Sequence, residues 1–341
     1  MFDFLIRQVL LVAGVKAVKE LSKPETRKKL FDGAEKVVDD IKAAGIQAVT
    51  AAENQIKEEQ YNARRKAKAE QASSLHAIDT SSGDIDSLRK AAFQASEGGD
   101  YDRAIGICTK ILKLDPKDTK ALSIRGSVYS AVGEYDTAQA DFNKALSIDP
   151  EEPAVFEGQA FMCYSKGELD NALLNINKAI RLDPDDGDFY WLRGKVYFDK
   201  EDVEKAIFDF STALKSDIKD TLKEQAHTLR GIAFLNKSEF EQAENDLTSA
   251  IEINPDNAEA YTYRGLVYIN QEESEKAQDD LNKALEINPE NTTALELRAA
   301  MYTGLGDIDK AKEDLDKAIS LKPENIDELI ESRKKLEEDA D

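Results

Sequence analysis

The chain has 341 residues and a formal net charge of −22, with 41% hydrophobic and 33% charged residues. This apolar fraction is low and this charged fraction is high for a compact globule, which favours thin helical stacks with much surface. The acidic excess lies after residue 80, because residues 1–80 carry slightly more Lys and Arg than Asp and Glu. Such an acidic surface disfavours nucleic-acid binding, which needs clustered cations, and favours basic or neutral partners.

Residues 1–22 are predicted to form an apolar amphipathic helix. Their longest uncharged run, from Gln8 to Val15, is much shorter than the roughly 20 residues that span a bilayer. The charges at Asp3 and Arg7 do not fit a signal peptide. The apolar face suits a helix lying in a membrane interface, but it equally suits contact with protein or self-association. The residues predicted to make this membrane or assembly contact are Phe4, Leu5, Val9 and Val12.

Residues 24–78 are predicted to form a long helical region with a partly heptad-like stripe, as in a coiled coil. Apolar residues from Leu30 to Ala48 follow alternating spacings of four and three. The run PETRKKLFDGAEKV at its start resembles the amphipathic tails of small bacterial membrane-associated stress proteins of the YtxH type. Peripheral membrane association and assembly through protein contacts both remain open. Ser and Thr residues before Asp84 mark a linker.

From residue 84 to residue 323 the prolines reveal a repeat. Pro116, Pro150 and Pro184 are spaced by 34 residues, and so are Pro255, Pro289 and Pro323. The interval between the two sets holds two periods and three extra residues, which fit near Thr221–Lys223. The chain therefore divides into seven units, which cover residues 85–118, 119–152, 153–186, 187–220, 224–257, 258–291 and 292–323.

Each unit reads as two amphipathic helices around a polar break. The second unit carries Leu122, Gly126, Tyr129, Ala138, Phe142, Ala145 and Pro150, and the sixth carries Tyr261, Gly265, Tyr268, Ala277, Leu281, Ala284 and Pro289. This pattern resembles the tetratricopeptide repeat (TPR), a 34-residue helical hairpin. The resemblance implies an all-α fold, an α-α superhelix of about seven hairpins. Residues 324–340 are expected to form a capping helix after the last hairpin.

Two positions of the repeat change together. Five units have Arg before the Gly or Ala of the first helix and Asp sixteen residues later, whereas the first unit has neither. The third unit has Gln159 and Asn175, a neutral pair that could also form a hydrogen bond. We therefore predict contacts between the two helices of a hairpin. The charged pairs are Arg125–Asp141, Arg193–Asp209, Arg230–Asp246, Arg264–Asp280 and Arg298–Asp314.

The first helix of each hairpin is expected to line a concave groove, as in the TPR family. The positions one step around this helix from its core face are apolar in units three to six. Exposed apolar and aromatic residues in a groove are typical of a partner-binding surface. The predicted groove residues are Phe161, Tyr164, Trp191, Lys195, Phe198, Ile232, Leu235, Leu266 and Ile269.

The sequence contains no nucleophile–base pair, phosphate-binding loop or metal-binding motif. Cys108, Cys163 and His227 occupy predicted core positions, which makes them packing residues rather than ligands or nucleophiles. We therefore expect no enzyme, no cofactor and no metal site. Two cysteines in different repeats also indicate a reducing, cytoplasmic compartment. The favoured hypothesis is a scaffold that binds an apolar or basic peptide or helix in the groove, with its N-terminal helices as a tether to a membrane or an assembly. The alternative is a self-assembling structural protein whose N-terminal helix fills a groove of its own chain, or that of a neighbouring copy in a homo-oligomer.

Overall fold

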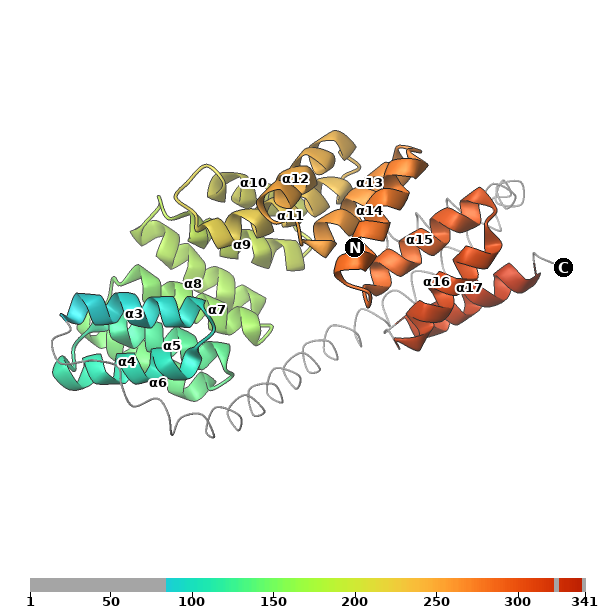
Figure 1. Cartoon of the computed structure of the whole chain (residues 1–341). Coiled ribbons are helices and arrows are strands. Elements are labelled where there is room, and N and C mark those ends of the chain that lie inside the picture. Colours follow the sequence, from blue (N-terminus) through green and yellow to red (C-terminus); the bar gives the residue numbers. More distant parts are fainter. Residues whose placement is uncertain (1–83, 322–324, 339–341) are drawn as a thin grey trace. The chain divides into compact units, whose positions relative to one another are not determined.

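The computed structural model describes residues 84–321 and 325–338. Within these ranges every regular element is a helix, and α3 to α16 follow one another as seven pairs (Figure 1). The all-α prediction and the predicted hairpin spacing are therefore confirmed. The helices are α3 (Ile85–Glu97), α4 (Tyr101–Leu114), α5 (Thr119–Ala131), α6 (Tyr135–Ile148), α7 (Pro153–Ser165), α8 (Leu169–Leu182), α9 (Gly187–Asp199), α10 (Val203–Ala213), α11 (Asp220–Asn236), α12 (Phe240–Ile253), α13 (Ala258–Asn270), α14 (Ser274–Ile287), α15 (Thr292–Leu305), α16 (Ile308–Ser320) and α17 (Ile326–Glu338).

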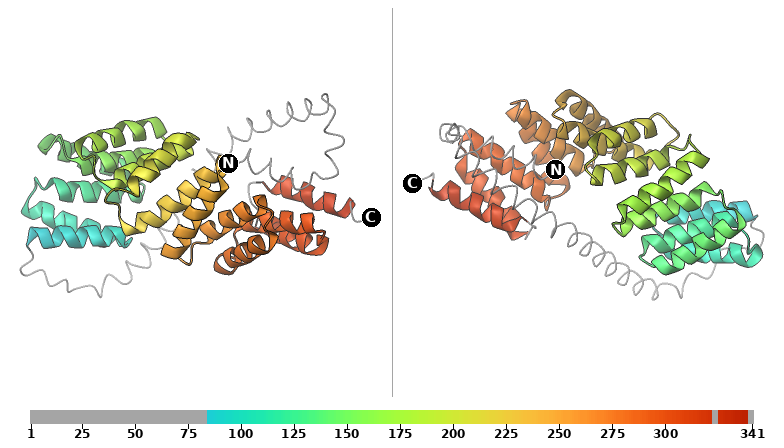
Figure 2. Two further views of the ribbon diagram at one scale, coloured as in Figure 1. Left: turned by 90° about the horizontal axis from the view of Figure 1, so that it is seen from above. Right: turned by 180° about the vertical axis from the view of Figure 1, so that it is seen from behind.

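The described helices belong to two compact units. The first unit comprises α3 to α9 together with Lys215–Ile218, and the second comprises α10 to α17. In the first unit the pairs α3/α4, α5/α6 and α7/α8 lie side by side (Figure 2). The boundary falls within the fourth repeat, where the sequence lacks its proline. There, buried Ile218 belongs to the first unit, and the Gly187 amide donates to the Asp217 carbonyl oxygen at 2.8 Å.

Each hairpin turns tightly because one residue adopts a left-handed backbone conformation. Gly99, Gly133, Gly167 and Gly306 supply it in four of the seven hairpins, with φ between 71° and 84°. In the other three the same position is held by Glu201, Ser238 and Glu272, with φ between 59° and 61°. Residues other than glycine adopt this conformation at a cost of about 1–2 kcal/mol. The turn geometry is thus kept even where the sequence does not favour it.

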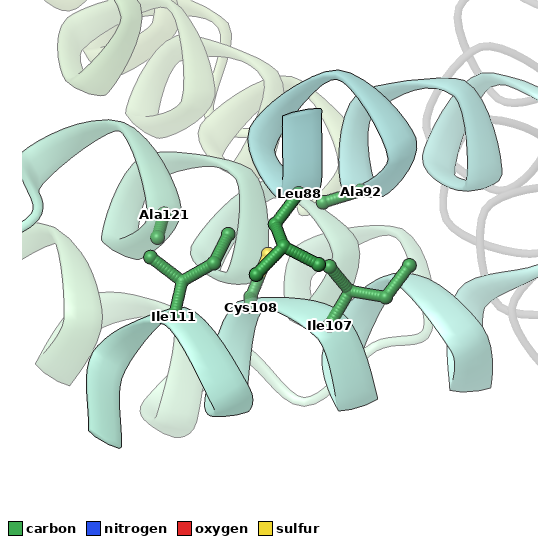
Figure 3. Packing of buried hydrophobic residues seen from close by; sticks show 6 residues of the cluster. All are labelled: Leu88, Ala92, Ile107, Cys108, Ile111 and Ala121. Carbon is green, nitrogen blue, oxygen red and sulfur yellow. The ribbon is translucent and has the colours of Figure 1, made fainter. Parts of the chain in front are cut away.

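The core of the first hairpin shows how small residues allow close packing. Cys108 lies among Leu88, Ala92, Ile107, Ile111 and Ala121, which come from α3, α4 and the start of α5 (Figure 3). Burial raises the pKa of the Cys108 thiol to about 12, so this thiol is a packing group rather than a nucleophile. Cys163 in α7 is buried too, and the prediction that both cysteines are core residues is confirmed.

Four of the predicted Arg–Asp pairs are present as two parallel hydrogen bonds. In each, the guanidinium Nε and Nη2 atoms donate to the two oxygens of one carboxylate at 2.6–2.9 Å. Both side chains are largely shielded from solvent; Arg264 and Asp280, for example, are 16% and 9% exposed. The confirmed pairs are Arg125–Asp141, Arg230–Asp246, Arg264–Asp280 and Arg298–Asp314.

The same arginines also connect neighbouring repeats, which the sequence did not reveal. The third nitrogen, Nη1, donates to a polar side chain on the second helix of the preceding hairpin. The acceptors of Arg125, Arg230, Arg264 and Arg298 are Thr109, Ser211, Thr248 and Asn282, at 2.6–3.2 Å. Each of these arginines therefore joins two hairpins.

Two predicted pairs have a different outcome. Among the described residues Gln159 and Asn175 form no hydrogen bond with each other, so this prediction is wrong. Asn175 donates instead to the Asn171 carbonyl oxygen of its own helix at 3.1 Å, because this acceptor lies one turn away. Arg193 and Asp209 lie on α9 and α10, which belong to different units, and their pairing remains a prediction. Within its own unit Arg193 donates to Asn177 at 2.7 Å.

His227 adds a further partner to one of these pairs. It is half-buried, and its Nδ1 atom lies 2.8 Å from Asp246. Burial by itself would raise the pKa of Asp246, but the hydrogen bonds from His227 and Arg230 prevail and lower it. The imidazole is therefore part of a structural hydrogen-bond network around the Arg230–Asp246 pair, as expected for a packed histidine.

A second set of contacts runs between successive first helices. The side-chain oxygens of Asn257 and Asn291 cap α13 and α15. Their amide nitrogens donate to Thr228 and Thr262, respectively, in the preceding repeat at 2.9–3.0 Å. Asp118 caps α5 in the same way and accepts from Arg89. One N-cap residue thus starts a helix and fixes it to its neighbour.

Helix α17 packs as if it were the first helix of an eighth repeat. Asn325, just before it, donates to Glu296 at 3.1 Å, with the same sequence separation of 29 residues as the other N-cap contacts. Arg333 donates to Asp316, which holds the helix position of Thr248 and Asn282 in earlier repeats. Leu329 and Leu336 are buried, so α17 covers the apolar end of the last hairpin, as predicted for a cap.

Candidate functional site

The nine predicted groove residues fall into two groups, one in each unit. Phe161 and Tyr164 lie on α7, and Trp191, Lys195 and Phe198 lie on α9. We call these five residues the aromatic face. The other four, which we call the aliphatic face, lie on α11 and α13 of the second unit; they are Ile232, Leu235, Leu266 and Ile269.

The aromatic face is accessible to solvent. The Phe161 side chain is 37% exposed, and the other four residues are half-buried. Tyr164 donates its hydroxyl hydrogen to Asp199 of α9 at 2.5 Å. The Lys195 ammonium lies 5.4 Å from the centre of the Tyr164 ring, a cation–π contact between the two helices. These contacts fix the orientation of Tyr164 and Lys195 before any partner binds.

Two hydrogen-bond donors on this face lack an acceptor. The Trp191 Nε1 atom is buried and has no hydrogen-bond partner among the described residues. No carboxylate in the described part of the chain lies within ion-pair distance of Lys195, although Lys166 and Lys200 nearby in sequence are both paired. Buried polar groups are nearly always hydrogen-bonded, so the buried Trp191 N–H needs an explanation, whereas the half-buried Lys195 ammonium can bind water.

The aliphatic face is closed to solvent, which corrects the prediction that it is open. Ile232, Leu235 and Leu266 are each 1% exposed, and Ile269 is half-buried. Thr228 and Thr262 at the neighbouring groove position are also buried, and their hydroxyls are engaged by the N-cap asparagines of the next repeat. The position of a residue on a helix gives the direction of its side chain but not how far neighbouring residues bury it. In this state a partner cannot reach Ile232, Leu235 and Leu266.

One residue that contacts the site was missing from the prediction: Asp199 accepts the Tyr164 hydrogen bond. Phe93 on α3 is 41% exposed at the repeat position that Phe161 holds in α7. The repeat alignment places both phenylalanines at this position, but Phe93 was not among the predicted groove residues. Nothing in the sequence singles out Asp199 from the many other acidic residues.

The remaining predicted contact residues, Phe4, Leu5, Val9 and Val12, lie outside the described residues, as does the segment that resembles YtxH-type tails. None of the helices in the described ranges combines the length and the apolar character needed to cross a bilayer. Across the same ranges, no three His, Cys, Asp or Glu side chains gather in a way that could hold a metal ion.

Family models match most of the repeat region. A model described as a tetratricopeptide repeat matches residues 258–291, and a second with the same description matches 119–152, 187–217 and 292–325. A third, described as a TPR repeat, matches 162–201 and 231–272. A search of curated proteins gave no match.

Solved structures are similar to the chain at low identity. The APC/C hetero-tetramer Cut9–Hcn1 shares 19% identity with a TM-score of 0.63, over 74% of this chain and 49% of that one. A tetratricopeptide repeat protein from Parabacteroides merdae shares 19% identity with a TM-score of 0.49, over 72% and 97% of the two chains. YrrB, described as a TPR protein with an unusual peptide-binding site, shares 24% identity with a TM-score of 0.47, over 56% and 97%.

The hairpin spacing, the shared contacts of the seven repeats and the family models agree with one another. Stacked helical repeats of this kind present extended surfaces to other proteins. The chain therefore belongs to the tetratricopeptide-repeat family, whose arrays are typically non-catalytic scaffolds for protein–protein interaction.

Proposed function

We propose that the aromatic face of α7 and α9 binds a segment of a partner protein. The observation that carries this proposal is the exposure of Phe161 beside half-buried Tyr164, Trp191 and Phe198. Trp and Tyr are enriched among the residues that dominate binding energy, and Trp191 is the single tryptophan of the chain. A cluster of aromatic rings that meets water is costly unless a partner covers it.

The partner segment is apolar and carries no excess of acidic residues. The chain has a net charge of −22, with its acidic excess after residue 80, where the repeats lie. An acidic protein repels an acidic partner over distances up to about 8 Å at physiological ionic strength, whereas it attracts a basic one. The face itself is aromatic and supplies apolar contacts rather than ion pairs.

Replacing Phe161 and Trp191 together by alanine is expected to abolish binding. Truncation of residues that dominate an interface costs about 2 kcal/mol or more, which raises the Kd at least about 30-fold. The probe is a set of 12-residue peptides selected from a random display library on the full chain, and the Kd is measured by fluorescence anisotropy. Phe161→Ala is tested as well, because this exposed ring contributes less to folding than Trp191.

The matched control is Leu174→Ala on α8 of the same unit, which truncates an apolar side chain that is 57% exposed. This variant should bind the peptides as the unaltered chain does. Thermal melting monitored by circular dichroism checks that all variants remain folded. If no peptide can be selected, or if the selected peptides bind the double variant with unchanged Kd, the aromatic face is not the binding site.

A second candidate function follows from the charges of the two parts of the chain. We propose as the alternative that the apolar segment 1–22 fills a groove of the repeats, in its own chain or in a second copy. Residues 1–80 carry a slight basic excess and the repeats are acidic, so their charges are complementary.

Deleting residues 1–80 tests this alternative. If the segment fills a groove of the repeats, the truncated chain should bind a hydrophobic dye such as ANS more strongly. Its solution mass should also fall from an oligomer to a monomer if the coverage comes from another copy. Light scattering and dye fluorescence measure the two effects, and Phe4→Ser combined with Val9→Ser in the full chain should reproduce them. Unchanged dye binding and mass in both variants would exclude the alternative.

A further inference from the structure

We propose that residues Lys215–Ile218 are a strap that fixes the second unit to the start of α9 and so limits how far the two units move independently. The strap belongs to the first unit, although in the chain it lies between α10 and α11 of the second unit. It acts on the motion of the chain and does not depend on the binding of a partner.

The chain passes between the two units at three points, and all of them lie in the fourth repeat. It leaves the first unit after Asp202, returns to it after Leu214 and leaves it again after Ile218. Units joined by a single linker are expected to move relative to one another. Here the segment between the second and third passages is docked on the first unit, so the second unit is held at more than one point.

The strap is held by a backbone hydrogen bond and by one apolar side chain. The Gly187 amide at the start of α9 donates to the Asp217 carbonyl oxygen at 2.8 Å, and Asp186 and Asp217 form a parallel β-bridge. Ile218 is 4% exposed and takes the position of the proline that ends the other repeats. The fourth repeat thus has a buried anchor where the others have a loop proline.

The connections on both sides of the strap are too short to act as a free hinge. Lys219 follows the strap, and α11 begins at the next residue, Asp220. The three residues that this repeat has in excess lengthen α11 to 17 residues instead of forming a loop. At the first passage, the Asp202 amide closes a tight turn on the Tyr197 carbonyl oxygen at 2.9 Å. Because hinge motion needs loop residues that absorb changes in φ and ψ, independent motion of the second unit requires release of the strap.

The distance between two spin labels, one on each unit, measures this restraint by double electron–electron resonance. The labels are attached after Thr137→Cys on α6 and Asp279→Cys on α14, since both positions are exposed. The native Cys108 and Cys163 are buried and are not expected to react with the label. With the strap intact, a single narrow distribution of distances is expected.

Gly187→Pro and Ile218→Ala each remove one contact of the strap. Proline is favoured at the first position of a helix, as at Pro153 of α7 one repeat earlier, and it lacks the N–H that binds Asp217. Both variants are expected to widen the distance distribution about twofold. Ile218→Ala should also accelerate hydrogen exchange of the Gly187 amide about tenfold, because its acceptor is no longer held in place.

The matched control is Asp217→Ala, which truncates an exposed side chain and keeps the carbonyl group that Gly187 binds. Its distance distribution should equal that of the unaltered strap. Circular dichroism checks that the variants stay folded, and Gly187→Pro decides the test if Ile218→Ala unfolds. A distribution that is already broad with the strap intact, that keeps its width in Gly187→Pro, or that widens equally in Asp217→Ala would overturn the inference.

Discussion

Replacing Asp280 by alanine is expected to lower the free energy of unfolding of the second unit by about 3–5 kcal/mol, the usual cost of breaking a buried ion pair. The Asp280 side chain is 9% exposed and accepts two hydrogen bonds from Arg264, at 2.7 and 2.9 Å. The hydrogen bond to Asp280, which outweighs burial, raises the pKa of Arg264, and the guanidinium stays charged when its partner is removed. The variant then holds a shielded cation with Thr248 as its remaining hydrogen-bond partner among the described residues. Urea denaturation followed by circular dichroism measures the loss.

Asp279→Ala provides the control for this prediction. Asp279 precedes Asp280 on α14, is exposed, and should change the stability by less than about 0.5 kcal/mol when truncated. Combining Asp280→Leu with Arg264→Met should recover much of the loss, because apolar residues can replace both members of a buried pair. Equal unfolding curves for Asp280→Ala and Asp279→Ala would mean that the pair contributes no stability.

Replacing Gly158 by alanine is expected to destabilise the first unit by about 1–3 kcal/mol, because the added methyl group has no room. A Cβ atom at this position would lie 2.7 Å from the Phe142 ring and 2.8 Å from the Ser127 hydroxyl oxygen. The fully buried ring also lies close against Gly126 of α5, where an added Cβ atom would be only 2.6 Å away. The ring therefore has no room to move toward α5. Phe142 thus fills the space that two glycines leave free. Thermal and urea unfolding report the effect.

The same substitution at Gly106 should have the opposite sign. Gly106 lies in the middle of α4, is exposed, and a Cβ atom there meets nothing within 4 Å. Because alanine favours a helix over glycine by about 0.8–1.0 kcal/mol, Gly106→Ala should stabilise the protein. Replacing Phe142 by the smaller leucine should relieve part of the clash in Gly158→Ala. Similar effects of alanine at both glycines would contradict the packing argument.

The sequence predicted the repeat and its internal ion pairs because both recur at fixed intervals. Asp141, Asp246, Asp280 and Asp314 could be assigned to their arginines since each pair has the same separation in every copy. The third contact of each arginine was not predicted, because its acceptor varies among Thr, Ser and Asn, and such residues are common on helix surfaces.

The candidate site was only partly predictable, for a different reason. The repeat position gave the side of the helix on which Phe161 and Ile232 lie, but it gave no information on how deeply neighbouring helices cover each residue. The structure leaves Phe161 exposed and buries Ile232, although both hold the same position. The unpaired state of Trp191 Nε1 depends on all surrounding atoms, and no local pattern in the sequence encodes it.

The way α17 docks has a consequence for protein engineering. Asn325 and Arg333 make the contacts that begin a new repeat, so the array ends on a junction that can receive more modules. A 34-residue cassette copied from residues 258–291 and spliced in directly after Asn325 would meet matching donors and acceptors at both of its ends. Longer versions of this scaffold could be built by such splicing, and the original helix would still seal the terminus.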